Sequence, residues 1–525
     1  MTSKLNRSLG LLQVTASGVG IIVGAGIYAL LGAATKSAGG VVWMSFGAAG
    51  LLSALTALSY AELSSMYPSA GAEFEYTRHV APAFVAFVVG WMMILGLVVA
   101  GGAVALGFAG YFRHFVDVPA PVVAVGLLVA MGGIATLGIE RAARLTVVLS
   151  VLQVAGLVAV IIVGAPHLGD YDLVGGASVG RVLGGAALVF FAFIGFDEVI
   201  TLAAETRDPA RTVPRALLIA LAISTALYMA VGVAAVSVLG PNALAESATP
   251  LADVMHTAIG SASSDAMAIA AMIATINTTL LVVTAASRLT WSMATVGTLP
   301  PALRVLNRRQ VPARAIGLAV MVAAGCAAMG RIALVAGVTD FAVFLVFVAV
   351  NATVIGLRFR QPNHRRPFRV PWSIGKVPVP AVFALLTVGA VVPSLEPAAI
   401  GWGSFVLLVG VVAYGLMRRR PAVVETIPGA DDPMTRRTQV AEAEALRAAE
   451  LLAVDFDAVE FDLAQFRQGL ERELQHGRAD PDTNVTDDDL VVTAKIALAH
   501  LNEIPDYYSR LEVMEAQAIE EWKHR

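Results

Sequence analysis

Long apolar stretches alternate with short polar connections over the first 420 residues of the chain. A membrane-spanning helix needs roughly 20 mostly apolar residues, and stretches of that length recur along this region. We expect membrane helices at residues 14–35, 41–66, 84–111, 121–138, 145–165, 182–204, 216–240, 266–292, 314–330, 336–357, 378–395 and 400–417. The pattern therefore predicts an all-α bundle of twelve transmembrane helices, with both ends on the same side of the membrane.

Composition agrees with a multi-pass membrane protein. Only 14% of the 525 residues are charged, whereas soluble domains average about 25%. The single cysteine, Cys326, excludes an intrachain disulfide. The first apolar run is too long for a signal peptide and lacks a small-residue cleavage site, so we expect a retained span in the inner (cytoplasmic) membrane.

Basic residues are distributed unevenly between the two sets of connections. If the N-terminus is cytoplasmic, the outside connections hold only Lys36, Arg113, Arg181 and Arg331, while most arginines lie inside. Positive residues are retained on the cytoplasmic side, so both termini are expected in the cytoplasm. The basic face is also expected to contact anionic lipid head groups.

The last 105 residues have a different character. Residues 421–525 hold 10 Lys/Arg and 23 Asp/Glu, a net charge of −13, against +10 for residues 1–420. This shift predicts a transmembrane domain at residues 1–420, a linker at 421–432 and an acidic all-α cytoplasmic domain at 433–525. Helix-prone sequence in the last part indicates about four helices.

Glycines crowd the middle of the first span. The stretch "GVGIIVGAGIY" (Gly18–Tyr28) holds four of them, and each weakens a helix by roughly 0.8–1 kcal/mol relative to alanine. A phosphate-binding loop is disfavoured, because the spacing and the expected preceding strand do not fit. Close helix packing through Gly20 and Gly24 is one alternative. A helix that breaks inside the membrane to bind a substrate is the other.

A second interruption in the matching half of the chain favours the broken helix. The sixth span, "GGAALVFFAFIGFDEVITLAAE", has Gly195 near its centre, followed by Asp197 and Glu198. Five spans in each half suit an inverted repeat of five plus five helices. Two half-helix ends can hold both charges of an amino acid zwitterion without an ionised side chain. That arrangement avoids about 2.5–3.5 kcal/mol for each charge placed at the membrane centre.

Three motifs resemble one transporter family. "GVGIIVGAGIY", "FFAFIGFDEV" followed by "AAETRDPARTVPRAL", and "TAASRLTWSMATVGTLP" resemble the first, sixth and eighth helices of amino acid–polyamine–organocation (APC) superfamily permeases. The branch of cationic amino acid transporters is the most similar, and the resemblance covers nearly all of residues 8–418. It implies a LeuT-like fold and alternating access around an amino acid at mid-membrane.

The resemblance also implies a substrate site at the two breaks. The carboxylate would meet amides of the first break and the ammonium would meet carbonyls of the sixth span. The implied substrate-binding residues are Gly24, Ala25, Gly26, Phe191, Ala192, Phe193, Ile194 and Gly195. Phe193 and Phe196 would shape the pocket or act as gates, with plain helix packing as the alternative.

The coupling ion is left open by the residues. Proton-coupled members of the family often carry a lysine in the fifth helix, where this chain places Gln153, which cannot titrate. Three alternatives for the coupling remain: a proton bound elsewhere in the protein, a sodium ion, or exchange without a coupling ion. Asp197 and Glu198 are candidates for a gate or proton site. Thr284 and Ser287 offer hydroxyl oxygens to a cation, although polar helix packing explains them equally well.

Three further acidic residues lie in or near the predicted spans. Glu62 and Glu205 lie toward cytoplasmic ends, where an ion pair or inner gate with Arg288 or a loop arginine is expected. Asp340 comes near the start of the tenth predicted span, so we expect it at the membrane interface.

The tail resembles a small bacterial domain of the DUF5661 type through "FRQGLERELQHG" and "TAKIALAHLNEIPDYYSRLEVME". That resemblance implies no activity. Glu473 and His476 are three residues apart, as are His500 and Glu503, so each pair shares a helix face. Such pairs build metal centres in helical bundles, while capping, ion pairing and solvation are the alternative.

These observations favour a secondary active amino acid permease that is ion-coupled. No serine–histidine–acid set, zinc spacing or nucleotide loop stands out, so we expect no enzyme activity, no nucleic-acid partner and no cofactor beyond H⁺ or Na⁺ as the coupling ion. The alternative is an amino-acid-sensing transceptor in which the acidic tail regulates or signals.

Overall fold

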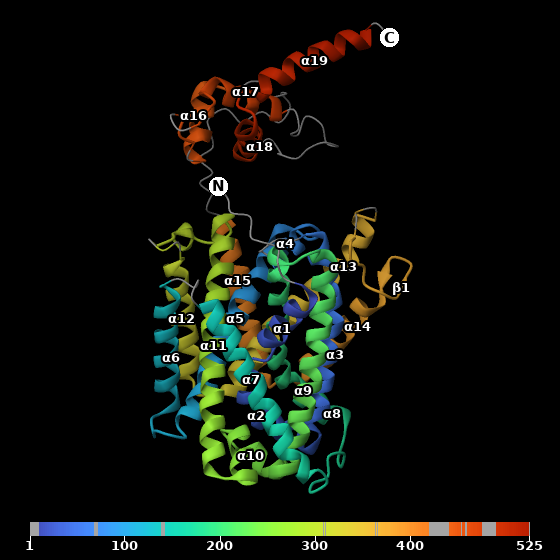
Figure 1. The fold of residues 1–525 in the computed structure, drawn as a ribbon, viewed down its shortest axis with the longest axis vertical. Coiled ribbons are helices and arrows are strands. Elements are labelled where there is room, and N and C mark those ends of the chain that lie inside the picture. The colour runs from blue at the N-terminus through green and yellow to red at the C-terminus, as the bar shows by residue number, and fades with distance from the viewer. Residues whose placement is uncertain are drawn as a thin grey trace. The chain divides into compact units, whose positions relative to one another are not determined.

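The computed structural model describes residues 10–523 except 68–71, 138–141, 308, 310, 363, 365, 419–439, 453, 457–458 and 475–489. The backbone contacts divide the chain into two units, Met1–Arg420 and Pro421–Arg525. Each unit is described here by itself. Both are built from helices, which Figure 1 colours from blue to red along the chain.

The first unit is a bundle of long apolar helices (Figure 1). Its first half contains α1 (Leu11–Ile22), α2 (Gly26–Ala38), η1 (Gly39–Val41), α3 (Val42–Met66), α4 (Ala72–Arg78), α5 (Ala83–Phe112), α6 (Ala120–Ala135), α7 (Ala142–Gly164) and η2 (Ala165–His167). Its middle contains α8 (Val179–Val189), η3 (Phe190–Phe193), η4 (Phe196–Glu205), α9 (Pro209–Glu246), α10 (Pro250–Ile259) and α11 (Ser261–Thr295). Its last part contains η5 (Pro301–Arg304), α12 (Ala313–Ala328), α13 (Ile332–Arg360), β1 (Ser373–Ile374), β2 (Val377–Pro378), α14 (Val379–Val391), η6 (Val392–Ser394) and α15 (Pro397–Arg418).

Every predicted span overlaps one or more of these helices. Eight helical segments are long and apolar enough to cross a membrane, and four shorter apolar helices accompany them. Several helices start where proline occupies the first turn, as at Pro209, Pro250 and Pro397, because proline lacks the amide that would be unpaired there. Strands β1 and β2 form a two-residue antiparallel hairpin between α13 and α14.

The packing explains the apolar sequence on both sides of each helix. Inside the unit, α5 packs against α11 and α13, and α9 packs against α1 and α3. On the outside, large apolar side chains such as Ile162, Phe405 and Leu416 are exposed. An exposed apolar belt of this extent is unfavourable in water and is typical of a surface that lies in lipid.

The described part of the second unit has four helices. They are α16 (Glu442–Leu451), α17 (Leu463–Glu473), α18 (Leu490–Glu503) and α19 (Tyr507–Lys523). Phe466, Leu470, Ala497 and Tyr508 are buried in a small core of their own.

Candidate functional site

The first predicted span is broken between α1 and α2. Val23 leaves the helical conformation with ψ 74°, and the Gly24 amide turns back to donate to the Ile22 carbonyl at 2.8 Å. The Ala25 amide donates to the Thr278 hydroxyl of α11 at 3.1 Å. The interrupted backbone therefore finds polar partners within the protein, which non-helical backbone at membrane depth requires.

The sixth predicted span is broken between η3 and η4. Ile194 is extended, with ψ 134°, and Gly195 has φ +107°. Residues with a side chain rarely adopt that conformation, so glycine is needed here for its backbone freedom. The chain then turns into η4 at Phe196. Both interruptions predicted from the glycine pattern are present.

The two broken segments are in direct backbone contact. A Cβ atom on Gly26 would lie 2.5 Å from the Ala192 Cα, which is far inside van der Waals distance. The Tyr228 hydroxyl of α9 lies 2.8 Å from the Ile22 carbonyl oxygen and 3.0 Å from the Ala192 carbonyl oxygen. One phenol group therefore bridges carbonyls that the two breaks have released from helical hydrogen bonding.

The breaks bring opposite partial charges together. The first turn of α2 directs unpaired amides toward the break, and the end of η3 directs carbonyls toward it. Gly24, Thr278, Ile194 and Gly195 are half-buried within a largely buried surround, so they border accessible space. A small molecule with one carboxylate and one ammonium group matches these two helix ends.

Aromatic side chains surround the breaks. Phe193 is fully buried, with its ring 5.2 Å from the ring of Tyr228 in an edge-to-face arrangement. Phe196 is also fully buried, and its ring lies 5.6 Å from that of Tyr60. Both positions are compatible with the predicted role of shaping a pocket and with helix packing.

Gln153 on α7 lies beside the first broken segment. Its side chain is buried, and neither its amide nitrogen nor its amide oxygen has a hydrogen-bond partner among the described residues. Its backbone carbonyl accepts a hydrogen bond of 2.7 Å from the Tyr28 hydroxyl of α2. A buried amide without partners is costly, so this side chain is a site where a polar ligand would be stabilised.

The two hydroxyl residues of α11 that were proposed as cation ligands differ in their hydrogen bonds. Ser287 donates to the Thr284 carbonyl at 2.8 Å, within the same helix. The Thr284 hydroxyl is buried and has no partner among the described residues. Thr284 is therefore the better placed of the two to contact a ligand.

The acidic residues of the membrane unit lie in different environments. Asp197 and Glu198 are half-buried next to the second break, and the Arg288 guanidinium of α11 interacts electrostatically with Glu198. Asp340, expected at the membrane interface, is fully buried within the protein in α13, and its depth in the membrane stays a prediction. Neither of its carboxyl oxygens has a hydrogen-bond partner in the described part of the chain.

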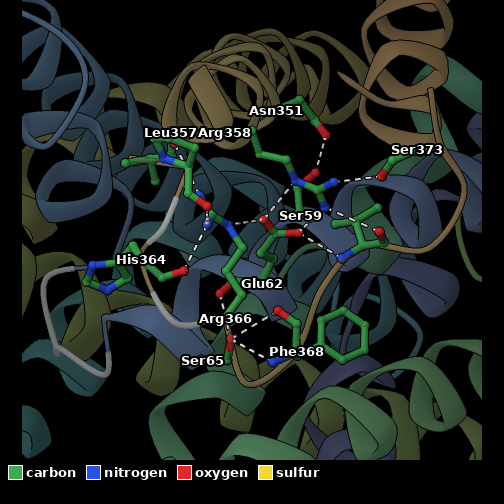
Figure 2. A network of polar contacts seen from close by, with 12 residues as sticks. Ser59, Glu62, Ser65, Asn351, Leu357, Arg358, His364, Arg366, Phe368 and Ser373 are labelled. Atoms are coloured by element: carbon green, nitrogen blue, oxygen red, sulfur yellow. Dashed lines mark hydrogen bonds and ion pairs between the residues drawn. The ribbon is translucent and has the colours of Figure 1, made fainter. Parts of the chain in front are cut away.

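Glu62 is the centre of a buried ion-pair network (Figure 2). Its carboxylate lies 2.5 Å from the Arg358 guanidinium of α13 and 3.2 Å from that of Arg366 in the following loop. It also accepts the Val370 amide at 2.7 Å. The predicted pairing with a loop arginine is thus confirmed for Arg366. The side chain of Glu205 lies outside the described residues.

The metal candidates of the tail are only partly described. Glu473 accepts the Tyr508 hydroxyl at 2.8 Å, and the His500 Nε2 lies 3.8 Å from the same carboxylate. Glu503 is exposed and His476 lies outside the described residues. Within the described ranges, no three His, Cys, Asp or Glu side chains converge as a metal site would need. The metal centre stays a prediction.

Sequence reasoning missed the side chains that support the breaks. Thr278 and Tyr228 contact residues far away in the sequence, 253 and 206 positions from Ala25 and Ile22. Single polar residues in apolar helices were the available signal, since they need an internal partner in lipid. That signal does not say which partner.

Comparison with known proteins shows the same division of the chain. The family model described as "Amino acid permease" matches residues 9–414, and a model of a protein family of unknown function, DUF5661, matches residues 445–517. A transporter of Mycobacterium tuberculosis, itself uncharacterized, is 33% identical over 79% of this chain and 92% of its own length. The branched-chain amino acid permease of Bacillus subtilis is 29% identical over 79% of this chain and 94% of its own. The vacuolar cationic amino acid transporter 2 of Arabidopsis thaliana is 30% identical over 69% of this chain and 61% of its own.

Proposed function

Because the chain belongs to the amino acid permease family, we propose that its membrane unit is a secondary active permease that moves amino acids by alternating access. Family membership makes it a multi-pass membrane protein that transports rather than catalyses. The observation that carries the proposed mechanism is the pair of helix breaks at Gly24 and Gly195, joined through Gly26, Ala192 and Tyr228.

The proposed binding mode uses the backbone. The substrate carboxylate takes the amides at Gly24, Ala25 and Gly26. It displaces the bond from the Gly24 amide to the Ile22 carbonyl and shares the Ala25 amide with the Thr278 hydroxyl that orients it. The ammonium takes carbonyls at the end of η3 and around Ile194. Helix ends supply partial charges of both signs, so the site binds a zwitterion without a buried ionised side chain.

The architecture that goes with this mechanism is a LeuT-like bundle of twelve spans in a five-plus-five inverted repeat. The four shorter apolar helices would complete the count by tilting or by pairing with a neighbouring segment. The distribution of arginines supports cytoplasmic termini and an inner-membrane location. We further propose residues 1–420 as the permease domain, 421–432 as the linker and 433–525 as the cytoplasmic domain.

Reconstitution tests this function directly. Purified full-length protein in proteoliposomes is expected to show counterflow of at least one labelled amino acid, and the same compound is expected to raise its melting temperature. A screen of amino acids and polyamines, with and without sodium and from pH 5 to 8.5, identifies the substrate. Absence of both binding and counterflow across the screen would refute the proposal.

The acidic tail supports a second candidate, an amino-acid-sensing transceptor. A domain with a net charge of −13 attached to a unit of net +10 suits salt-dependent docking that regulates the permease or signals. Deletion of residues 433–525 is then expected to change the uptake rate or its dependence on ionic strength. Unchanged uptake at equal expression, over 50 to 300 mM salt, would exclude the regulatory role.

A further inference from the structure

A group of titratable side chains comes together beside the second break, contributed by α3, α4 and η4. Tyr60 of α3 donates a hydrogen bond of 2.9 Å to the Glu73 carboxyl of α4. The Tyr60 ring also packs edge to face on Phe196, at 5.6 Å, and Phe196 is followed directly by Asp197 and Glu198. Tyr60 therefore connects Glu73 to the broken sixth span.

Water has little access to the centre of this group. Glu73 is only 4% exposed, and Tyr60 and Tyr76 are fully buried. The Tyr76 hydroxyl has no hydrogen-bond partner among the described residues, although the charges of Glu73 and Asp197 act on it. Because buried polar groups are normally hydrogen-bonded, this hydroxyl is a candidate to bind a water that carries the exchangeable proton.

The positive charge described around these three carboxylates is limited. On α4 itself, Arg78 is exposed and lies over the Phe74 ring. Arg288 acts on Glu198. On the helices packed against α4, the 30 residues of α5 contain no charged side chain. In α13, Arg358 is bound by Glu62 and Arg360 donates to the Val80 carbonyl. Asp340, also on α13, would add negative rather than positive charge. Carboxylates that repel one another where water has little access do not all remain ionised, so we infer that the group holds at least one proton.

Electrostatics place that proton on Glu73, which lies outside the long spans. Burial raises the pKa of the Glu73 carboxyl to about 8, and the nearby Asp197 and Glu198 carboxylates also raise it. The hydrogen bond from Tyr60 acts in the opposite direction, because it stabilises the charged form. Glu73 therefore titrates in the range where the pH on the two sides of a cytoplasmic membrane differs.

We propose that Glu73, together with Asp197 and Glu198, forms the proton-binding site that couples amino acid transport to the pH gradient. This inference rests on the proposed permease function and names its coupling ion. The carboxylate takes a proton from water on one side of the membrane and releases it on the other, with no other bond made or broken. A proton fits this site better than Na⁺, which needs several converging oxygen ligands, because within the described residues no three acidic side chains converge closely enough to hold a metal ion.

The first experiment needs no substrate. The melting temperature of the purified wild-type protein is expected to fall as pH rises from about 5 to about 8.5. The folded protein keeps the Glu73 proton up to a pKa of about 8, while the unfolded chain loses it near pH 4.5, so the unfolded state binds fewer protons over this interval. Glu73→Gln, which cannot titrate, is expected to flatten the slope. Glu396→Gln, which removes an exposed carboxyl, is the control and is expected to keep it.

The second experiment compares two modes of transport in proteoliposomes. Glu73→Gln is expected to lose at least 10-fold of the uptake driven by an inwardly directed proton gradient, yet to keep substrate counterflow, which needs no net proton movement. Tyr60→Phe removes the donor that favours the charged form, so it is expected to shift the pH midpoint of uptake upward. That variant keeps the test valid if Glu73→Gln does not fold.

Three outcomes would overturn the proposal. They are gradient-driven uptake by Glu73→Gln at the wild-type rate, stimulation by a sodium gradient in place of a proton gradient, and loss of proton coupling in Asp340→Asn with Glu73→Gln unaffected. Failure of the permease function is distinguishable, because the wild-type protein would then show no counterflow at all while the pH slope of its melting temperature persisted.

Discussion

The Ala25 amide donates a hydrogen bond of 3.1 Å to the Thr278 hydroxyl, although the two residues are 253 positions apart. The contact joins the interrupted segment between α1 and α2 to the middle of α11. Thr278 itself donates to the Ala274 carbonyl of its own helix at 3.0 Å, so its oxygen is held in place to accept the amide. The Ala25 amide is thereby held in one orientation before a substrate binds.

Replacement of Thr278 tests this orientation. Thr278→Val keeps the shape but leaves the Ala25 amide without a partner, which costs about 1–3 kcal/mol. We expect weaker substrate binding, by about 5-fold to 100-fold, measured as the concentration needed for half-maximal thermal stabilisation. Thr278→Ser keeps the hydroxyl and is expected to remain within about 3-fold of the wild type. Equal losses in both variants would contradict the assigned role.

Gly26 is the position where a single methyl group should stop transport. In Gly26→Ala the new Cβ would lie 2.5 Å from the Ala192 Cα, so the two breaks must separate, at a cost of about 1–3 kcal/mol or more. We expect loss of counterflow and a lower melting temperature. Gly317→Ala on α12, where a Cβ meets nothing within 4 Å, is the control and is expected to be neutral or slightly stabilising.

Tyr228 is expected to act on both breaks through one atom. Tyr228→Phe removes the hydroxyl that lies between the Ile22 and Ala192 carbonyl oxygens. The Ala192 oxygen then loses this donor, while the Ile22 oxygen keeps the Gly24 amide. We expect a loss of about 1–3 kcal/mol in unfolding free energy and faster proteolysis at the breaks. Tyr414→Phe, whose ring packs on Phe84 and Phe87, should leave both measurements unchanged. Wild-type stability of Tyr228→Phe would show that water replaces the hydroxyl.

The Glu62 network should be far more sensitive than a surface ion pair. Glu62→Gln leaves Arg358 and Arg366 buried without their anion, which is expected to cost about 3–5 kcal/mol. Glu396→Gln breaks the exposed pair with Arg331 and should cost about 1 kcal/mol or less. Thermal unfolding in detergent separates the two cases. If Glu62→Met combined with Arg358→Met and Arg366→Met recovers stability, the cost in the single variant comes from the unpaired charges.

Local sequence signals predicted the breaks well because their cause is local. Glycines at Gly24 and Gly195 weaken the helix where it is interrupted, and no tertiary information is needed to see them. The start of the tenth span was predicted less well, since the apolar run was taken to begin at residue 336, whereas α13 begins at Ile332. Asp340 therefore lies about one turn further from the start of its helix than the sequence suggested.

Partnerships between helices were harder to predict. A loop arginine was foreseen as a partner of Glu62, without saying which, and Arg366 takes that role. Arg358 lies within an apolar helix, and its pairing depends on how α3 and α13 are packed. Glu73 was overlooked because it lies in a short connecting helix, where an acidic residue is ordinarily solvated. Its burial arises only when α4 folds back against α5 and α13.

The absence of any side chain between Gly26 and Ala192 has a mechanical consequence. Helices separated by flexible side chains can shift or tilt independently. Two backbones in direct contact move together, because a densely packed interior is hardly compressible. We therefore expect the start of α2 and the end of η3 to move as one rigid unit. The amides that bind the substrate carboxylate and the carbonyls that bind its ammonium group would then separate from it together. The proposed permease would therefore release the whole zwitterion in one step.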